Sequence, residues 1–170
     1  MFNRILKTGA AALLSATVIG CVSGDGRTAA TAAADPLANP AAVTHDRLVR
    51  GTSLPNQWPS YGGGYDEQRF SPLKQINETN VKDLGLAWFA DYRTNQNQHG
   101  SPLYIDGVIY VSTARNVVHA YDARDGRELW TYHPNMVPNP NLGLVNRGIA
   151  AWNGKIYMGQ LDAKLVAIDA

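Results

Sequence analysis

The chain has 170 residues, of which 45% are hydrophobic and 17% charged, and this composition is typical of a globular protein rather than a disordered one. Fifteen basic and fourteen acidic side chains leave a formal charge of +1 without a dense basic cluster, which argues against a nucleic-acid partner. Cys21 is the single cysteine, so this chain alone cannot assemble a disulfide framework, a zinc site or a haem-attachment motif.

Residues 1–20 are predicted to be a secretory signal of the lipoprotein type. Arg4 and Lys7 precede an uncharged, largely apolar run from residue 8 to residue 20, which is too short to cross a hydrocarbon layer of ~30 Å as a permanent helix. The sequence Val18-Ile19-Gly20-Cys21 resembles the bacterial lipobox, in which the cysteine is acylated and the leader is cut just before it. We therefore expect lipidation at Cys21 and a membrane tether. The alternative is an ordinary leader that is cut near residues 32–34.

Residues 21–57 are predicted to be a flexible tether. They are rich in Ala, Thr, Gly, Asp and Pro, and they show little apolar periodicity. A short helical turn at residues 46–49 is expected within them, with Thr44 as its N-cap and with Gly51 and Pro55 ending it. The folded part is expected to occupy residues 58–170.

An internal repeat organises this folded part. Residues 107–123 align without a gap on residues 154–170, at an offset of 47 residues. The matches are Gly107 with Gly154, Ile109 with Ile156, Tyr110 with Tyr157, Ala120 with Ala167, Asp122 with Asp169 and Ala123 with Ala170. A period of this size with the patterning of strands is typical of β-propeller blades.

The repeat predicts two units of short strands. In the first unit the strands are expected at residues 101–105, 108–113, 117–121 and 127–132, and in the second at residues 148–152, 155–159 and 164–168. Asp106-Gly107 and Asn153-Gly154 are expected to form tight two-residue hairpin turns. Four antiparallel strands make one blade, so the fold class is predicted to be all-β, a β-propeller with about its first two blades present. More chain is expected after residue 170, because blades bury their faces only against neighbouring blades; a small closed β-sandwich is the alternative.

The segment containing Ala120, Asp122, Gly126 and Trp130 resembles the tryptophan-docking motif of quinoprotein dehydrogenases. In that motif each tryptophan is wedged between neighbouring blades, which buries a large aromatic area. Asp125 stands where threonine is usual. The same motif is found in propellers that bind no cofactor, so it indicates the fold more than the chemistry.

A second resemblance covers the start of the folded part. Residues 58–77, with Asn80-Val81 and residues 84–88, are similar to the opening segment of the methanol and ethanol dehydrogenases that use pyrroloquinoline quinone (PQQ). Those propellers have eight blades. The resemblance extends over residues 58–170, which implies an N-terminal fragment of such an enzyme, and it implies that residues 86–90 are a strand of the closing blade.

A third resemblance, at residues 145–154, points to a cofactor site. In the family the arginine at the position of Arg147 contacts a carboxylate of the quinone, a task that suits a permanently charged, planar guanidinium. The alternative is a surface arginine beside a strand. Asn141 and Leu142 stand where the family has adjacent cysteines, so that contact with the quinone is missing. His99 stands where the family has a glutamate beside the arginine; it is either a further cofactor-binding residue or a solvated histidine in a degenerate site.

Together these resemblances imply the N-terminal part of a periplasmic PQQ-dependent alcohol dehydrogenase. Such an enzyme transfers a hydride from a primary alcohol to the quinone and passes electrons to cytochrome c or another acceptor. Calcium and an aspartate base assist the reaction, and their residues are expected after residue 170, so neither a catalytic residue nor a metal ligand is assigned here. One alternative is a lipid-anchored, non-catalytic propeller scaffold that resembles the outer-membrane assembly lipoprotein. Another is a dehydrogenase-derived propeller that has lost its cofactor.

Overall fold

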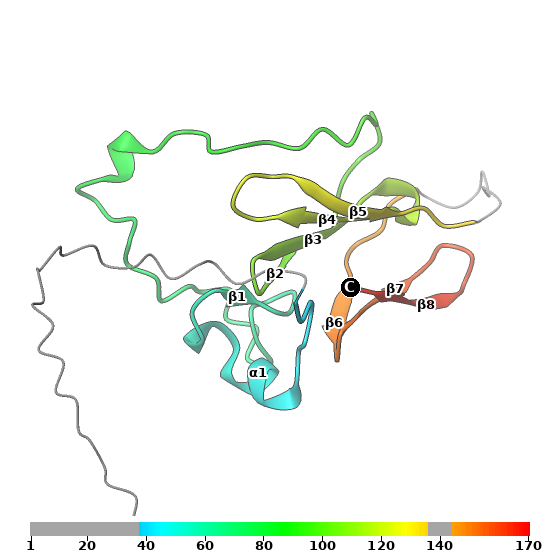
Figure 1. Ribbon diagram of the computed structural model, residues 1–170, viewed down its shortest axis with the longest axis horizontal. Helices are drawn as coiled ribbons and strands as arrows, with labels where there is room; N and C mark the ends of the chain where they lie inside the picture. The colour runs from blue at the N-terminus through cyan, green and yellow to red at the C-terminus, as the bar shows by residue number, and fades with distance from the viewer. Residues whose placement is uncertain (1–37, 136–143) are drawn as a thin grey trace, which may run out of the picture. The chain divides into compact units, whose positions relative to one another are not determined.

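The computed structural model describes residues 38–135 and 144–170, and within them the chain is mostly β (Figure 1). The strands form two antiparallel sheets, one of five strands and one of three. None of the helices in these two ranges is long and apolar enough to cross a bilayer. The predicted signal at residues 1–20, Cys21 and the pair Asn141 and Leu142 lie outside the described residues.

The larger sheet has its strands in chain order. They are β1 (Gln57–Trp58), β2 (Leu103–Ile105), β3 (Val108–Ser112), β4 (Val118–Asp122) and β5 (Glu128–Tyr132). Asp106 and Gly107 join β2 to β3 with φ angles of 51° and 88°, as a two-residue hairpin turn with positive φ at both positions requires. The four strands predicted for the first unit are confirmed to within two residues at each end.

The smaller sheet repeats the plan of the larger one. It consists of β6 (Ala150–Trp152), β7 (Lys155–Gly159) and β8 (Leu165–Asp169), and Asn153 and Gly154 form its hairpin turn with φ angles of 46° and 79°. Val108 pairs with Asp122 in the larger sheet, and the residues 47 positions later, Lys155 and Asp169, pair in the smaller one. The internal repeat is therefore confirmed in strand register as well as in sequence.

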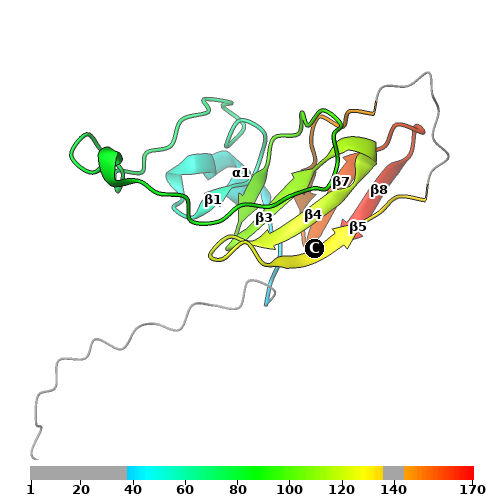
Figure 2. The ribbon, with the colours of Figure 1, turned by 90° about the horizontal axis from the view of Figure 1, so that it is seen from above.

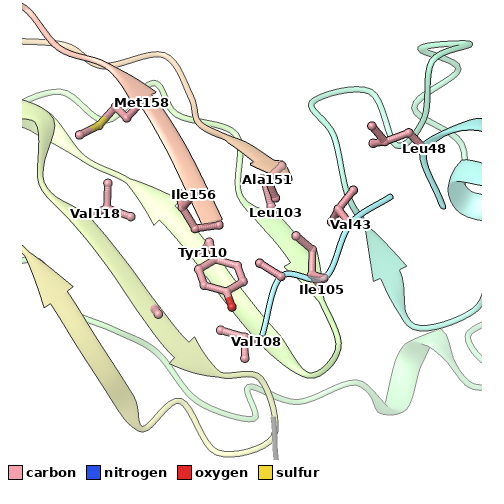
Figure 3. Close-up of a cluster of buried hydrophobic side chains, with 12 residues drawn as sticks. Val43, Leu48, Leu103, Ile105, Val108, Tyr110, Val118, Ala151, Ile156 and Met158 are labelled. Carbon is pink, nitrogen blue, oxygen red and sulfur yellow. The ribbon is translucent and has the colours of Figure 1, made fainter. Parts of the chain in front are cut away.

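The hydrophobic core lies between the two sheets, which run side by side in Figures 1 and 2. Figure 3 shows the fully buried ring of Tyr110 from β3 beside Ile156 from β7. Leu103, Val108 and Val118 of the larger sheet are also buried, as are Ala151 and Met158 of the smaller one. Full burial of one such aliphatic side chain contributes about 1.5–3 kcal/mol, so the contact between the sheets stabilises both.

The helix α1 (His45–Arg50) confirms the helical turn that the sequence predicts. Thr44 is its N-cap and accepts a hydrogen bond from the backbone N–H of Arg47 through its Oγ1, and Gly51 is its C-cap with φ 49°. The surrounding segment, however, differs from the expected flexible tether, because Ala41 and Val43 are fully buried in the core. The segment is anchored by isolated apolar residues that do not recur at a regular spacing. Hydrophobic periodicity in the sequence therefore did not indicate that the segment is packed against the core.

Residues 40–57, which we call the N-terminal strap, contact the hairpin turns of both sheets. The guanidinium of Arg47 forms a bidentate ion pair with Asp106 at the β2–β3 turn, with N–O distances of 2.7 and 3.0 Å. At the β6–β7 turn the backbone N–H groups of Asn153 and Gly154 donate to the carbonyls of Val43 and Ala41, both at 3.0 Å. The strap therefore joins the two sheets at the end where their hairpins turn.

Trp88 docks onto the turn between β4 and β5. Its indole Nε1 donates to the carbonyl of Ala123 at 3.0 Å, and its ring lies against Gly126, where a Cβ atom would come within 2.6 Å of the ring. Residues 84–90 around it pair with no strand in the described part of the chain. The assignment of residues 86–90 to a closing blade stays a prediction.

Candidate functional site

The candidate site begins at the tight 3-10 turn η3 (Ala114–Asn116), which connects β3 to β4. Arg115 and Asn116 have φ angles of 62° and 59° in succession, a left-handed conformation that asparagine tolerates better than most residues. Asn116 is fully buried. The turn lies at the opposite end of the strands from the hairpin turns and the N-terminal strap.

The loop that carries His99 is fixed to this turn from both sides. The side chain of Gln98 accepts a hydrogen bond from the backbone N–H of Ala114 at 2.9 Å. Gly100 lies so close to the end of β3 that a Cβ atom there would come within 2.5 Å of the Ser112 carbonyl oxygen. His99 itself is exposed, so its imidazole is available from solvent while its two neighbours are held in place.

The loop that carries Arg147 is fixed to the same turn by Asn146. The carboxamide of Asn146 is buried, and its Nδ2 donates to the Asn116 side chain at 2.9 Å and to the Gly159 carbonyl at 3.1 Å. Its Oδ1 accepts a hydrogen bond from the N–H of Gly148 at 3.0 Å. Arg147 is exposed, and no hydrogen bond or ion pair joins its side chain to the rest of residues 38–135 and 144–170.

The structure therefore brings the segments around both predicted site residues to one turn. The two loops share a pattern that the sequence analysis missed: an amide, then the site residue, then a glycine, in Gln98-His99-Gly100 and in Asn146-Arg147-Gly148. Amide side chains in loops often bond to nearby backbone groups, so this repeated order is a signal that would have pointed to Gln98 and Asn146.

Two neighbouring hollows lie beside these loops. One, of about 390 Å³, is lined by Arg147, Gly148, Tyr61, Ser101 and Tyr157 among others, and the next, of about 460 Å³, shares Tyr61 and Ser101 and adds Arg69. The Arg69 guanidinium lies 4.4 Å from the centre of the Tyr61 ring, a cation–π contact. His99 lines neither hollow. Each hollow therefore combines an arginine with Tyr61.

Two titratable groups of the larger sheet, His119 and Asp122, are paired with neighbouring side chains. Burial lowers the pKa of His119, whose Nδ1 lies 3.1 Å from the Thr131 hydroxyl and 3.4 Å from the Glu128 carboxylate. Asp122 is fully buried, and its hydrogen bonds with Arg124 hold the pKa of the carboxyl well below its usual range. No three His, Cys, Asp or Glu residues come together as a possible metal site within the described ranges. These groups stabilise the sheet and lie outside the two hollows.

The sequence model of the PQQ-dependent glucose, ethanol and alcohol dehydrogenase β-propeller domain matches residues 58–170. The chain belongs to this family. One relative is the dehydrogenase subunit of the quinone-dependent alcohol dehydrogenase of Komagataeibacter europaeus. It is 45% identical to this chain over 132 residues, which are 75% of this chain and 18% of that protein. The resemblance stated from the sequence is thereby confirmed.

Solved structures of the family give the same result. The quinohemoprotein alcohol dehydrogenase of Pseudomonas putida HK5 superposes with a TM-score of 0.70 at 43% identity, over 77% of this chain and 20% of that one. A europium-containing methanol dehydrogenase superposes with a TM-score of 0.65 at 36% identity, over 74% of this chain and 23% of that one. The chain thus spans about a fifth of the length of these relatives. It is a mostly β chain with antiparallel sheets, and it corresponds to part of their β-propeller domain.

Proposed function

We propose that this chain supplies the first part of the quinone-binding propeller of a periplasmic PQQ-dependent alcohol dehydrogenase, and that Arg147 binds a carboxylate of the quinone. The proposal rests on the surroundings of Arg147. This residue is exposed and lines a hollow, and its side chain has no hydrogen-bond or ion-pair partner among the described residues. The loop that carries it is fixed by the hydrogen bonds of Asn146. A free, permanently charged fork on a rigid support is what recognition of a carboxylate needs.

The residues around Arg147 fit a planar polyanion such as PQQ. The rings of Tyr61 and Tyr157 line the hollow beside the arginine, so it offers aromatic surface together with positive charge. The Ser112 hydroxyl, close to Gly100, is buried and has no hydrogen-bond partner in the described part of the chain. A buried hydroxyl left in that state costs about 1–3 kcal/mol, which a ligand or an ordered water would relieve.

When bound, the quinone would supply the redox chemistry by accepting a hydride from a primary alcohol. This chain's own residues would bind and orient it: Arg147 through its charge, and His99 through a hydrogen bond from its imidazole. The ligands of calcium, the proton-accepting aspartate and the groups that pass electrons to cytochrome c or another acceptor would lie in other parts of the enzyme. Lipidation at Cys21 would tether the protein to a membrane.

The test is quinone binding by the intact protein. Equilibrium dialysis should show uptake of PQQ, and Arg147→Ala should weaken it by roughly 10- to 100-fold, because a hydrogen-bonded charge is lost. Arg147→Lys should also bind less well, because an ammonium lacks the planar fork. Reconstitution with quinone and calcium should then support dye-linked oxidation of primary alcohols; no quinone uptake together with no activity would end the proposal.

A His99→Ala variant tests the second site residue in the same assay. If the imidazole binds the cofactor, the affinity for PQQ falls; if His99 is only solvated, the affinity stays that of the unmodified protein. The rival function, a lipid-anchored scaffold without a cofactor, rests on Cys21 and on the missing cysteine pair at Asn141 and Leu142. Lipidation in the absence of any quinone uptake would favour the scaffold.

A further inference from the structure

We infer that Asn146 is a positioning residue for Arg147, and that through the turn at residues 114–116 it couples the Arg147 loop to the His99 loop. The inference concerns the two loops themselves, and it rests on the proposed function only where quinone affinity is the readout.

The Asn146 side chain makes three hydrogen bonds. A carboxamide offers two N–H donors and an oxygen with two lone pairs, and here both ends are used: Nδ2 bonds to the Asn116 side chain and to the Gly159 carbonyl, and Oδ1 bonds to the N–H of Gly148. Asn146 is only 6% exposed, so water cannot easily replace these contacts. Its bonds reach the residue after Arg147 and the end of β7, and so fix Arg147 relative to the smaller sheet.

The turn η3 is hydrogen-bonded to both site loops. Each of its three residues bonds to one of the two site loops: the N–H of Ala114 to Gln98, the N–H of Arg115 to the Leu144 carbonyl at 2.8 Å, and the side chain of Asn116 to Asn146. The first bond fixes the His99 loop and the other two fix the Arg147 loop. Because the three residues are consecutive in one turn, the position of the turn sets the relative placement of both loops.

The hydrogen bonds of Asn146 are distinct from those that form the smaller sheet. The strands β6 and β7 are already joined by their own backbone ladder, so the Asn146 contacts are not needed to form the sheet. Gln160, the residue after Gly159, provides a comparison. Its Nε2 donates to the Tyr132 hydroxyl at 2.9 Å, which also links the two sheets, but within the described part of the chain it forms no hydrogen bond with either site loop. Truncation of Gln160 therefore removes a link between the sheets and leaves the Arg147 loop fixed.

The experiment compares Asn146→Ala with Gln160→Ala in the intact protein. The first readout needs no cofactor: trypsin cleaves after Arg147 only when the loop leaves its fixed conformation, and cleavage after Lys74, in an exposed segment, gives an internal reference rate. Asn146→Ala should accelerate cleavage after Arg147 by about tenfold relative to Lys74, because the lost hydrogen bonds no longer oppose opening of the loop. Gln160→Ala should stay within about twofold of the unmodified protein, because it removes no bond of the loop.

The second readout is the affinity for PQQ. Asn146→Ala should weaken binding by about tenfold more than Gln160→Ala does, because the guanidinium is still present but no longer held. If both variants cleave and bind alike, Asn146 is not a positioning residue and the inference fails. If the unmodified protein binds no PQQ, the proposed function fails, while the tryptic rates still decide whether Asn146 fixes the loop.

Discussion

The two sheets share strand register and sequence, yet equivalent residues in them have different surroundings. Asp122 in the larger sheet is fully buried and bonded to Arg124, whereas its counterpart Asp169 is exposed and paired with Lys155. Tyr110 is fully buried in the larger sheet, whereas its counterpart Tyr157 in the smaller sheet is only partly buried. The repeat therefore fixes backbone geometry, while burial and polar pairing depend on what contacts each turn.

The largest effect is expected at Gly126, where the Trp88 ring lies against the β4–β5 turn. Gly126→Ala should lower the free energy of unfolding by about 2–4 kcal/mol, because its φ of +73° is strained for alanine and the added Cβ would overlap the ring. Gly154→Ala in the smaller sheet is the matched control. Its φ is +79°, but an added Cβ would lie 3.8 Å from the Pro40 carbonyl oxygen, an ordinary contact distance, so only the backbone penalty of roughly 1–2 kcal/mol is expected. Urea unfolding measures both, and equal losses would contradict the role assigned to Trp88.

The two tryptophans give the next effect. Trp88→Phe and Trp130→Phe remove the same aromatic area, but only the first leaves the Ala123 carbonyl without its donor. Trp88→Phe should therefore lower the free energy of unfolding by about 1–2 kcal/mol more than Trp130→Phe. A larger loss from Trp130→Phe would mean that its indole N–H has a partner in the folded protein.

The buried Asp122 predicts a dependence on pH. Hydrogen bonds from Arg124 hold the pKa of this carboxyl below that of an unfolded aspartate, which is about 3.9. The unfolded state therefore binds more protons in acid, so the stabilisation is present above about pH 4 and is lost as the pH falls towards the folded pKa. Asp122→Asn should lower the urea midpoint at pH 7 and make it less sensitive to acid, and parallel pH profiles would refute this. Asp169→Asn is the control in the smaller sheet.

The smallest effect is expected for the Tyr110 hydroxyl, which is buried between the sheets without a hydrogen-bond partner in the described residues. Tyr110→Phe should leave the free energy of unfolding unchanged or raise it by up to about 1 kcal/mol, because an unsatisfied polar group is removed. Tyr157→Phe, at the equivalent but less buried position, should change it by less. A clear loss of stability in Tyr110→Phe would reveal a hydrogen bond of that hydroxyl.

Most of the strands could be predicted from the sequence because two local signals agree. Asp106-Gly107 and Asn153-Gly154 set the hairpin turns, and the 47-residue repeat sets the strands around them. The N-terminal strap could not be predicted, because Ala41 and Val43 reach the core without any regular spacing. Its anchoring depends on contacts with hairpin turns that lie 59 residues (Arg47 to Asp106) and 110 residues (Val43 to Asn153) later in the chain.

The candidate site was predictable only in part. Arg147 and His99 were named from the family resemblance, and their roles towards the quinone stay predictions. What the sequence could not reveal is that both loops meet at one turn. That arrangement depends on tertiary hydrogen bonds from Gln98 and Asn146, and no periodic pattern marks such bonds before the fold is known.

The N-terminal strap also has a practical consequence for any use of the protein on a surface. The strap holds the polypeptide against the hairpin turns, and the five residues of β3 separate those turns from the Arg147 loop by roughly 15 Å. A tag, an electrode linker or a bead attached upstream of residue 38 thus joins the fold at the end remote from Arg147. Immobilisation through the N-terminus should leave that face accessible to small molecules and to soluble redox mediators.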